Sequence, residues 1–338
     1  MRALTGLKRR LLLRGAIASG LSMAWACAAS GLRAGLNVIY LPKQINNPYN
    51  TIVGSGVLEA MRELSGSGKM MGPSTAQALA QEPFIQQIIA GRPHAAIIAA
   101  NDPIALLPWI RKLLATGTKV VAVDTDLATD ARDLFINQAS QEGVGRAQMQ
   151  LMAKLMGGKG EFAILSATPT ANNQNAWIYW MLQELRRPAY QEMRLVKVAY
   201  GNDDPAMSLE QLSGLLQTFP NLRGVIAPTT VGILAAAEHL AGLPRKGTIQ
   251  LTGLGTPNQM RRYVKDGTVQ AFQLWNPVDL GYLAAYAAAN LAAGVISGKK
   301  GDVFSAGRLG TYTGGAKGEL ILGAPTTFDI NNIDQFNY

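Results

Sequence analysis

The chain is poor in the residues on which much enzyme chemistry depends. It has one cysteine, Cys27, and two histidines, His94 and His239, in 338 residues. A single cysteine excludes an internal disulfide, and two distant histidines without cysteine partners form no recognisable zinc site. Neither a G-x-S-x-G nucleophile elbow nor a G-x-G-x-x-G loop after the first apolar run is present. The sequence therefore predicts a protein that is not an enzyme and that needs no cofactor.

The chain has little net charge once the N-terminal residues are set aside. Residues 1–34 hold six basic residues and no acidic one, so the formal charge of +9 falls to +3 for the remainder. Three excess positive charges, scattered along the chain, do not predict a nucleic-acid partner.

A long hydrophobic run is also missing, apart from a marginal one near the N-terminus. There a basic cluster, residues 8–10, precedes Leu11–Leu13 and an alanine-rich stretch with small residues on both sides of Cys27. This layout predicts a signal peptide over residues 1–34 and a periplasmic location, reached by the Sec or the twin-arginine route. A retained anchor helix and a lipoprotein modified at Cys27 are the alternatives.

Apolar runs and helical patterns alternate through the rest of the chain. Residues 36–41 are apolar and β-branched, which is typical of a strand buried on both faces. Asn47 and Pro48 then begin a helical pattern, at the N-cap and first-turn positions that they favour. The alternation restarts near Ser140, which predicts two similar α/β lobes with parallel sheets.

Polar residues follow several of the predicted strands, where parallel sheets bind ligands at their carboxyl edge. Candidates are Lys43, Asn47 and Tyr49 after the first strand, Asp124 and Asp126 after the fourth, and Asn173, Gln174, Trp275 and Asn276 after later ones. A carboxylate can accept hydrogen bonds from two neighbouring sugar hydroxyls, whereas helix capping and a glycosidase pair are the other interpretations of Asp124 and Asp126. Tyr49, Trp177 and Trp275 could stack on a sugar ring or belong to the core.

At this point the chain resembles a known family, the periplasmic sugar-binding proteins of ABC transporters of the ribose-binding type. The resemblance covers residues 36–338 and is greatest to the branch that holds rhamnose-binding and autoinducer-2-binding proteins. It is carried by the segments LPK (41–43), NNPY (46–49), DTD (124–126), INQ (136–138), PT (169–170), NQNAW (173–177), YGND (200–203), IAP (226–228), TPN (256–258) and LW (274–275).

The resemblance implies a set of ligand-binding positions. The residues at the positions that hold autoinducer-2 in that branch are Lys43, Asp124, Asn173, Gln174, Pro228 and Thr230. Asn173 stands where those binders carry Asp and Thr230 where they carry Ala, which favours a rhamnose-type ligand. Gly255 stands where ribose binders carry Asp, which disfavours ribose.

The resemblance also implies the architecture and the partners. We expect a signal peptide at 1–34, a first lobe from 35–138 with 276–301, and a second lobe from 139–275 with 302–338, joined by a three-segment hinge. The expected function is capture of a monosaccharide, L-rhamnose or a related deoxyhexose, by a monomer that delivers it to a membrane ABC permease. Binding of autoinducer-2 or another sugar, and sensing through a chemoreceptor or sensor kinase, are the alternatives.

Overall fold

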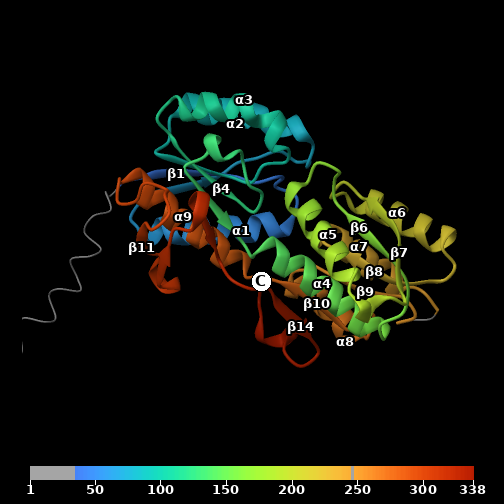
Figure 1. Cartoon of the computed structure of the whole chain (residues 1–338). Helices are drawn as coiled ribbons and strands as arrows, with labels where there is room; N and C mark the ends of the chain where they lie inside the picture. The colour runs from blue at the N-terminus through green and yellow to red at the C-terminus, as the bar shows by residue number, and fades with distance from the viewer. Residues whose placement is uncertain (1–34, 245–246) are drawn as a thin grey trace, which may run out of the picture.

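The predicted α/β fold is confirmed: the computed structural model has two lobes, each built on a parallel sheet (Figure 1). The structure describes residues 35–244 and 247–338. The predicted signal peptide, with Cys27, lies outside the described residues. No helix among those residues has the length and the apolar composition that crossing a membrane requires.

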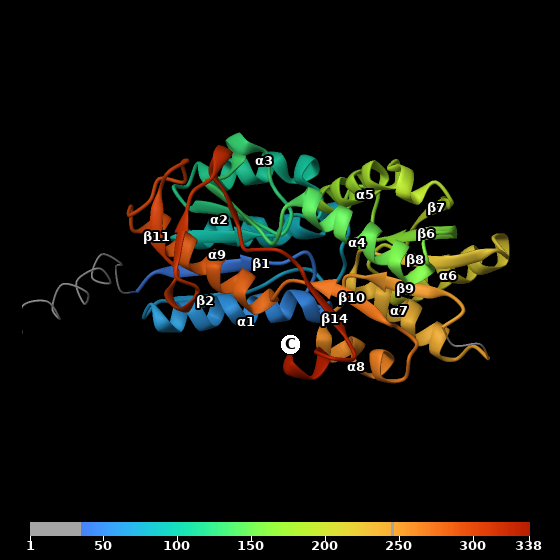
Figure 2. The ribbon, with the colours of Figure 1, turned by 60° about the horizontal axis from the view of Figure 1, so that its bottom comes forward.

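The first lobe contains a six-stranded sheet in the order β13-β5-β4-β3-β1-β2, in which every neighbouring pair is parallel. Its strands are β1 (Asn37–Leu41), β2 (Ser67–Met70), β3 (Ala95–Ile98), β4 (Lys119–Val123), β5 (Leu134–Asn137) and β13 (Glu319–Ile321). Helices α2 (Glu82–Gly91) and α3 (Pro103–Leu114) cover one face, and α1 (Pro48–Glu63) and α9 (Pro277–Ala292) cover the other (Figure 2).

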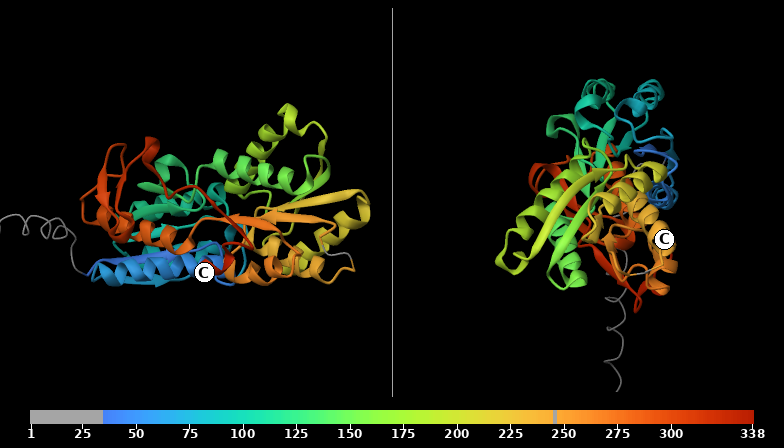
Figure 3. Two further views of the ribbon diagram at one scale, coloured as in Figure 1. Left: turned by 90° about the horizontal axis from the view of Figure 1, so that it is seen from below. Right: turned by 90° about the vertical axis from the view of Figure 1, so that its right-hand side faces the viewer.

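Helices α1 and α9 lie against each other along the first lobe (Figure 3). Glycines permit this close approach. A Cβ atom on Gly56 would lie 1.9 Å from the carbonyl oxygen of Val278, and one on Gly281 would lie 1.9 Å from that of Val53. Helix α1 begins in the first lobe, where the strands of its sheet end, and α9 begins directly after the second lobe. Both helix starts border the pocket described below, so the contact between the helices fixes these two segments relative to each other.

The second lobe contains a four-stranded parallel sheet in the order β7-β6-β8-β9. Its strands are β6 (Gly160–Ser166), β7 (Met193–Tyr200), β8 (Leu222–Ala227) and β9 (Gln250–Gly253). An antiparallel pair, β10 (Ala271–Leu274) with β14 (Thr326–Asp329), extends the sheet through a bridge between Leu254 and Gln273. The helices of this lobe are α4 (Gln141–Met156), α5 (Asn172–Leu185), α6 (Pro205–Thr218), α7 (Thr230–Ala241) and α8 (Pro257–Lys265).

The chain passes between the two sheets three times. It leaves the first sheet after β5, returns after β10, and leaves again between β13 and β14. We expected the last crossing near Asp302, with all of 302–338 in the second lobe, and this is wrong. The hairpin of β11 (Val303–Ser305) and β12 (Thr311–Thr313) follows α9, and β13 pairs with β5 in the first sheet.

Side-chain contacts explain why β13 joins the first lobe. Asn137 donates a hydrogen bond of 2.8 Å to the Glu319 carboxylate, and Arg132 donates to the carbonyl oxygens of Lys317 and Gly318 at 2.9 and 3.3 Å. These partners are far from Glu319 in sequence, so a three-residue strand carries little local indication of the sheet to which it belongs.

Candidate functional site

A pocket of about 420 Å³, open solvent included, lies between the two lobes where the strands of both sheets end. Nine of the residues predicted from the sequence line it: Lys43, Asn47, Tyr49, Asp124, Asn173, Gln174, Pro228, Thr230 and Trp275. The other lining residues are Asn50, Trp177, Asp203, Thr229, Leu254 and Leu274.

The start of α1 supplies the first polar edge of the pocket. Asn47 is the N-cap, and its side-chain oxygen accepts a hydrogen bond of 3.0 Å from the backbone N–H of Tyr49, while Pro48 occupies the first turn. The same oxygen accepts a hydrogen bond of 3.3 Å from the Thr230 hydroxyl of the second lobe. Asn47 therefore caps a helix of one lobe and contacts the other.

Asp124 is the centre of the polar network. It follows β4 with a positive φ of 63°, and its carboxylate forms an ion pair of 2.9 Å with the Lys43 ammonium group. The Tyr49 hydroxyl donates to it at 3.2 Å and the Asn173 amide at 3.3 Å. The side chains of Lys43 and Asp124 are only 13% and 10% exposed, so the ion pair is largely removed from water. Such a charge pair is a strong, directional partner for hydroxyl groups.

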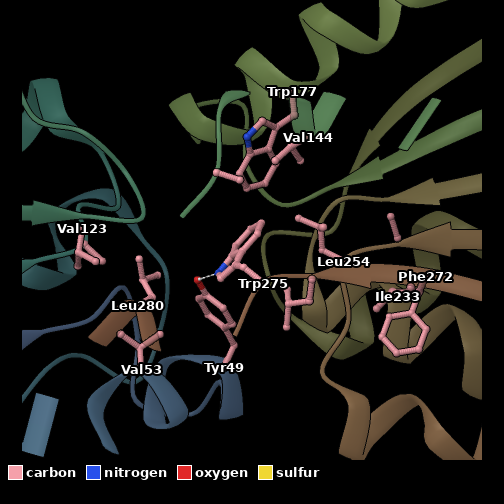
Figure 4. Close-up of a cluster of buried hydrophobic side chains, with 14 of the residues drawn as sticks. Tyr49, Val53, Val123, Val144, Trp177, Ile233, Leu254, Phe272, Trp275 and Leu280 are labelled. Carbon is pink, nitrogen blue, oxygen red and sulfur yellow. Dashed lines mark hydrogen bonds between the residues drawn. The ribbon is translucent and has the colours of Figure 1, made fainter. Parts of the chain in front are cut away.

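Three aromatic side chains form the apolar wall of the pocket (Figure 4). The Trp275 ring packs edge-on against Tyr49, with centroids 6.2 Å apart, and its indole N–H donates to the Tyr49 hydroxyl at 2.9 Å. Burial, and then the negative charge of Asp124, raise the pKa of Tyr49, so this hydroxyl remains a hydrogen-bond donor. Trp177 lies 5.9 Å from Trp275 at a tilted angle.

The indole nitrogen of Trp177 is buried and, among the described residues, has no hydrogen-bond partner. In the close-up it lies on the side of the ring that faces the first lobe (Figure 4). A buried N–H without a partner costs about 1–3 kcal/mol. A ligand oxygen in the pocket would remove that cost.

The second lobe contributes an amide pair at the start of α5. The Gln174 side-chain oxygen accepts hydrogen bonds from the Ser166 hydroxyl at 2.7 Å and from the backbone N–H of Ala167 at 2.8 Å. That oxygen is occupied within the lobe, so the group that Gln174 can offer to a ligand is its amide donor. Asn173 reaches across to Asp124, as described above.

Two predicted site residues do not reach the pocket. Asp126 is not among the lining residues and pairs with Arg132, whose guanidinium also contacts the carbonyl groups before β13. Asn276 is the N-cap of α9, where its side chain accepts a hydrogen bond of 3.0 Å from Val278. Both therefore have structural partners, and the prediction that they line the site is wrong.

Five of the six further lining residues are not among the residues predicted from the sequence, and Trp177 was expected only as a ring that could stack on a sugar or belong to the core. Trp177 and Asp203 stood in segments that carried the family resemblance, and Thr229 is the middle residue of the loop after β8, so their positions at strand ends were a usable indication. Leu254 directly follows β9 and Leu274 ends β10, and nothing in the sequence separates these two leucines from core residues. Asn50 lies in the first turn of α1.

Comparison with known proteins identifies the family. The family described as periplasmic binding protein domain matches residues 38–296, which is more than half of the chain. The chain belongs to this family. A curated relative, the D-ribose/D-allose-binding protein of Pseudomonas aeruginosa, is 23% identical over 194 residues, and the alignment covers 60% of that protein.

Solved structures of periplasmic binding proteins resemble the chain over nearly its full length. A sugar ABC transporter protein from Actinomyces odontolyticus is 41% identical, with a TM-score of 0.73, and the alignment covers 92% of this chain and 99% of that one. A solute-binding protein from Clostridium phytofermentas with bound L-rhamnose is 34% identical, with a TM-score of 0.86 and coverage of 90% and 98%. LsrB from Clostridium saccharobutylicum in complex with AI-2 is 18% identical, with a TM-score of 0.84 and coverage of 90% and 100%, a likeness in fold.

The arrangement in this periplasmic binding protein suits reversible binding. One part of the pocket wall presents a charge pair with several donors, and another part is aromatic and aliphatic. Among residues 35–244 and 247–338 no group of three or more His, Cys, Asp or Glu side chains could hold a metal ion.

Proposed function

We propose that this protein captures a monosaccharide, L-rhamnose or a related 6-deoxyhexose, and delivers it to a membrane ABC permease. The observation that carries the proposal is the set of contacts at Asp124. Groups from both lobes, Tyr49 of the first and Asn173 of the second, converge on one carboxylate that is already paired with Lys43. A neutral ligand with adjacent hydroxyls could exchange hydrogen bonds with this network and hold the lobes together.

The apolar wall favours a sugar that has lost a hydroxyl. Leu254 and Leu274 offer no hydrogen-bond partner to an exocyclic hydroxyl, whereas a methyl group against these two side chains would be buried without an unpaired polar atom. The solute-binding protein with bound L-rhamnose supports the same choice, since it combines 34% identity with nearly complete coverage.

The expected affinity is in the micromolar range, which corresponds to about −8 kcal/mol and is within reach of a few buried hydrogen bonds and one aromatic platform. A thermal-shift panel of L-rhamnose, L-fucose, D-ribose, D-xylose and autoinducer-2 tests the proposal. A ligand at 100 times its Kd stabilises the folded protein by about 2.7 kcal/mol. We expect the largest shift with L-rhamnose; stabilisation by autoinducer-2 alone, or by none of the five, would contradict the proposal.

We also propose that residues 1–34 direct export, so that the protein acts in the periplasm. N-terminal sequencing of the protein from a periplasmic extract tests this, with a start near residue 29 or 35 expected. The role as transporter component or as ligand sensor for a chemoreceptor or sensor kinase is separated by growth of a deletion strain on the sugar. Loss of growth is expected from a transport role, and loss of chemotaxis alone from a sensing role.

A further inference from the structure

Asp203 is a carboxylate of the pocket for which the family resemblance supplied no ligand-binding role. It lies in the loop after β7, on the second lobe, whereas Asp124 lies after β4 on the first. The two carboxylates and the Lys43 ammonium group are close enough to interact electrostatically. The pocket thus contains two acidic groups and one basic group.

Lys43, the basic residue that lines the pocket, is already paired with Asp124. Lys43 forms its ion pair with Asp124 at 2.9 Å, and Asp203 forms no ion pair with any described residue. Its carboxylate accepts a hydrogen bond from the Thr229 hydroxyl, and an ionised carboxylate has about four acceptor positions. Burial raises the pKa of Asp203, with the negative charge of Asp124 acting in the same direction. Because the Thr229 hydroxyl occupies only one acceptor position, other acceptor positions of this carboxylate remain unused at the pocket wall.

The backbone of Asp203 has a left-handed conformation. Asn202 and Asp203 both have positive φ, 53° and 50°, which asparagine and aspartate adopt more readily than other non-glycine residues. The Gln44 side chain, from the other lobe, donates a hydrogen bond of 3.3 Å to the Asp203 carbonyl oxygen. This hydrogen bond joins the loop that carries Asp203 to the first lobe.

We propose that Asp203 is a specificity-determining ligand contact, whose carboxylate accepts a hydrogen bond from a sugar hydroxyl on the second-lobe side of the pocket. Asp124 and Asp203 would then hold the ring from opposite lobes, and both would have to be satisfied when the lobes are together. The inference rests on the proposed sugar-binding function. It also restricts the ligand class: a carboxylate or phosphate on the ligand would add a third negative charge beside one cation, so the site selects neutral sugars.

Asp203→Asn is the test, and Asp204→Asn is its matched control. Asparagine keeps the shape of the side chain, tolerates positive φ and replaces the ionic acceptor by a weaker neutral one. Asp204 is the adjacent exposed residue and caps α6 by accepting a hydrogen bond of 2.8 Å from Met207, a role that asparagine fills equally well. Both variants remove one negative charge, but only one of them changes the pocket.

The readouts are the Kd from isothermal titration calorimetry and the Tm without ligand, using whichever sugar of the five-member panel stabilises the unaltered protein most. We expect Asp203→Asn to weaken binding by about 10- to 100-fold without lowering the unliganded Tm, because it removes a half-buried charge that has no ion-pair partner among the described residues. Asp204→Asn should leave the Kd within about twofold.

Three results would overturn the inference, and they are distinguishable from one another. An unchanged Kd in Asp203→Asn with sugar binding intact in the unaltered protein contradicts the role of Asp203 alone. Weaker binding accompanied by a lower unliganded Tm would assign Asp203 a structural role instead. If no sugar of the panel binds the unaltered protein, the proposed function fails and the inference fails with it.

Discussion

The two lobes contribute to the pocket in different ways. In the first lobe, Lys43, Tyr49 and Asp124 are joined to one another by an ion pair and a hydrogen bond. In the second lobe, Trp177 has an indole N–H without a partner among the described residues, and Asp203 has acceptor capacity left over. The first-lobe groups are paired with one another, whereas these two second-lobe groups have room for an acceptor and a donor that a ligand would supply.

This difference suggests a division of labour. A set of groups that is already paired keeps its geometry when the ligand leaves, so the first lobe can hold a preformed site. Groups that lack partners gain most from the ligand, so the second lobe supplies binding energy that depends on the lobes being together. Substitutions in the first-lobe half should therefore abolish binding, and those in the second-lobe half should weaken it in steps.

The largest effect is expected from Asp124→Ala. The substitution removes the acceptor shared by Tyr49 and Asn173, and it leaves the largely buried Lys43 ammonium group without its counter-ion. Breaking a buried pair in this way costs about 3–5 kcal/mol. We expect the sugar-induced thermal shift to disappear, which corresponds to a loss of affinity of more than about 100-fold.

Asp126→Asn is the control for that substitution. Asp126 is two residues away but pairs with Arg132 outside the pocket. We expect a lower unliganded Tm and an unchanged Kd by titration calorimetry. Sugar binding that survives in Asp124→Ala, or that is lost in Asp126→Asn, would contradict the assignment of the first-lobe half.

The contrast between these two aspartates shows how far the sequence could be interpreted. Both follow the same strand, at positions i and i+2, and both are equally placed to face a crevice. Asp126 does not line the pocket, because its carboxylate forms an ion pair with Arg132 in the next segment. A partner six residues away, directly after the 3₁₀ turn at Thr129–Ala131, leaves no periodic pattern, so the choice between the two could not be made from the residues alone.

Features that depend on local pattern were predicted better than those that depend on distant pairing. The strand β1, the Asn47 cap and the restart at α4 follow from apolar periodicity and capping chemistry, and the structure has all three. The sheet that takes up β13 is decided by contacts with Asn137 and Arg132, about 180 residues earlier. The third crossing of the chain was misplaced for that reason.

A smaller effect is expected in the second-lobe half from Trp177→Phe. Phenylalanine keeps an aromatic wall beside Trp275 but removes the indole N–H, which is the unpartnered donor. One hydrogen bond is worth about 0.5–1.5 kcal/mol, so we expect a Kd increased by about 3- to 12-fold. Without ligand the Trp177 indole N–H makes no hydrogen bond with any described residue, so the substitution removes none from the unliganded protein. The unliganded Tm should therefore fall less than it would on loss of a hydrogen bond.

Trp180→Phe is the matched control for this substitution. Trp180 lies on the same helix, outside the pocket, where the Arg146 guanidinium stacks over its ring at 5.0 Å. Its Kd should match that of the unaltered protein. Equal affinities for Trp177→Phe and Trp180→Phe would mean that the ligand does not use the indole nitrogen, and the apolar wall would then act by shape alone.

The smallest effect is expected from Thr229→Val, which changes the pocket through another residue. The hydroxyl of Thr229 donates to the Asp203 carboxylate, so its loss frees that side chain to adopt other rotamers while the acceptor itself remains. We expect the Kd to rise by about two- to fivefold, in proportion to the share of conformers that no longer face the ligand. Thr229→Ser keeps the hydroxyl and should restore the original Kd.

A double-mutant cycle with Asp203→Asn sharpens this prediction. In Asp203→Asn, where the ionic acceptor is already gone, Thr229→Val should raise the Kd by a smaller factor than it does alone, because the two residues act as one unit. Fully additive losses in that double-mutant cycle would show that Thr229 contacts the ligand itself and does not position Asp203.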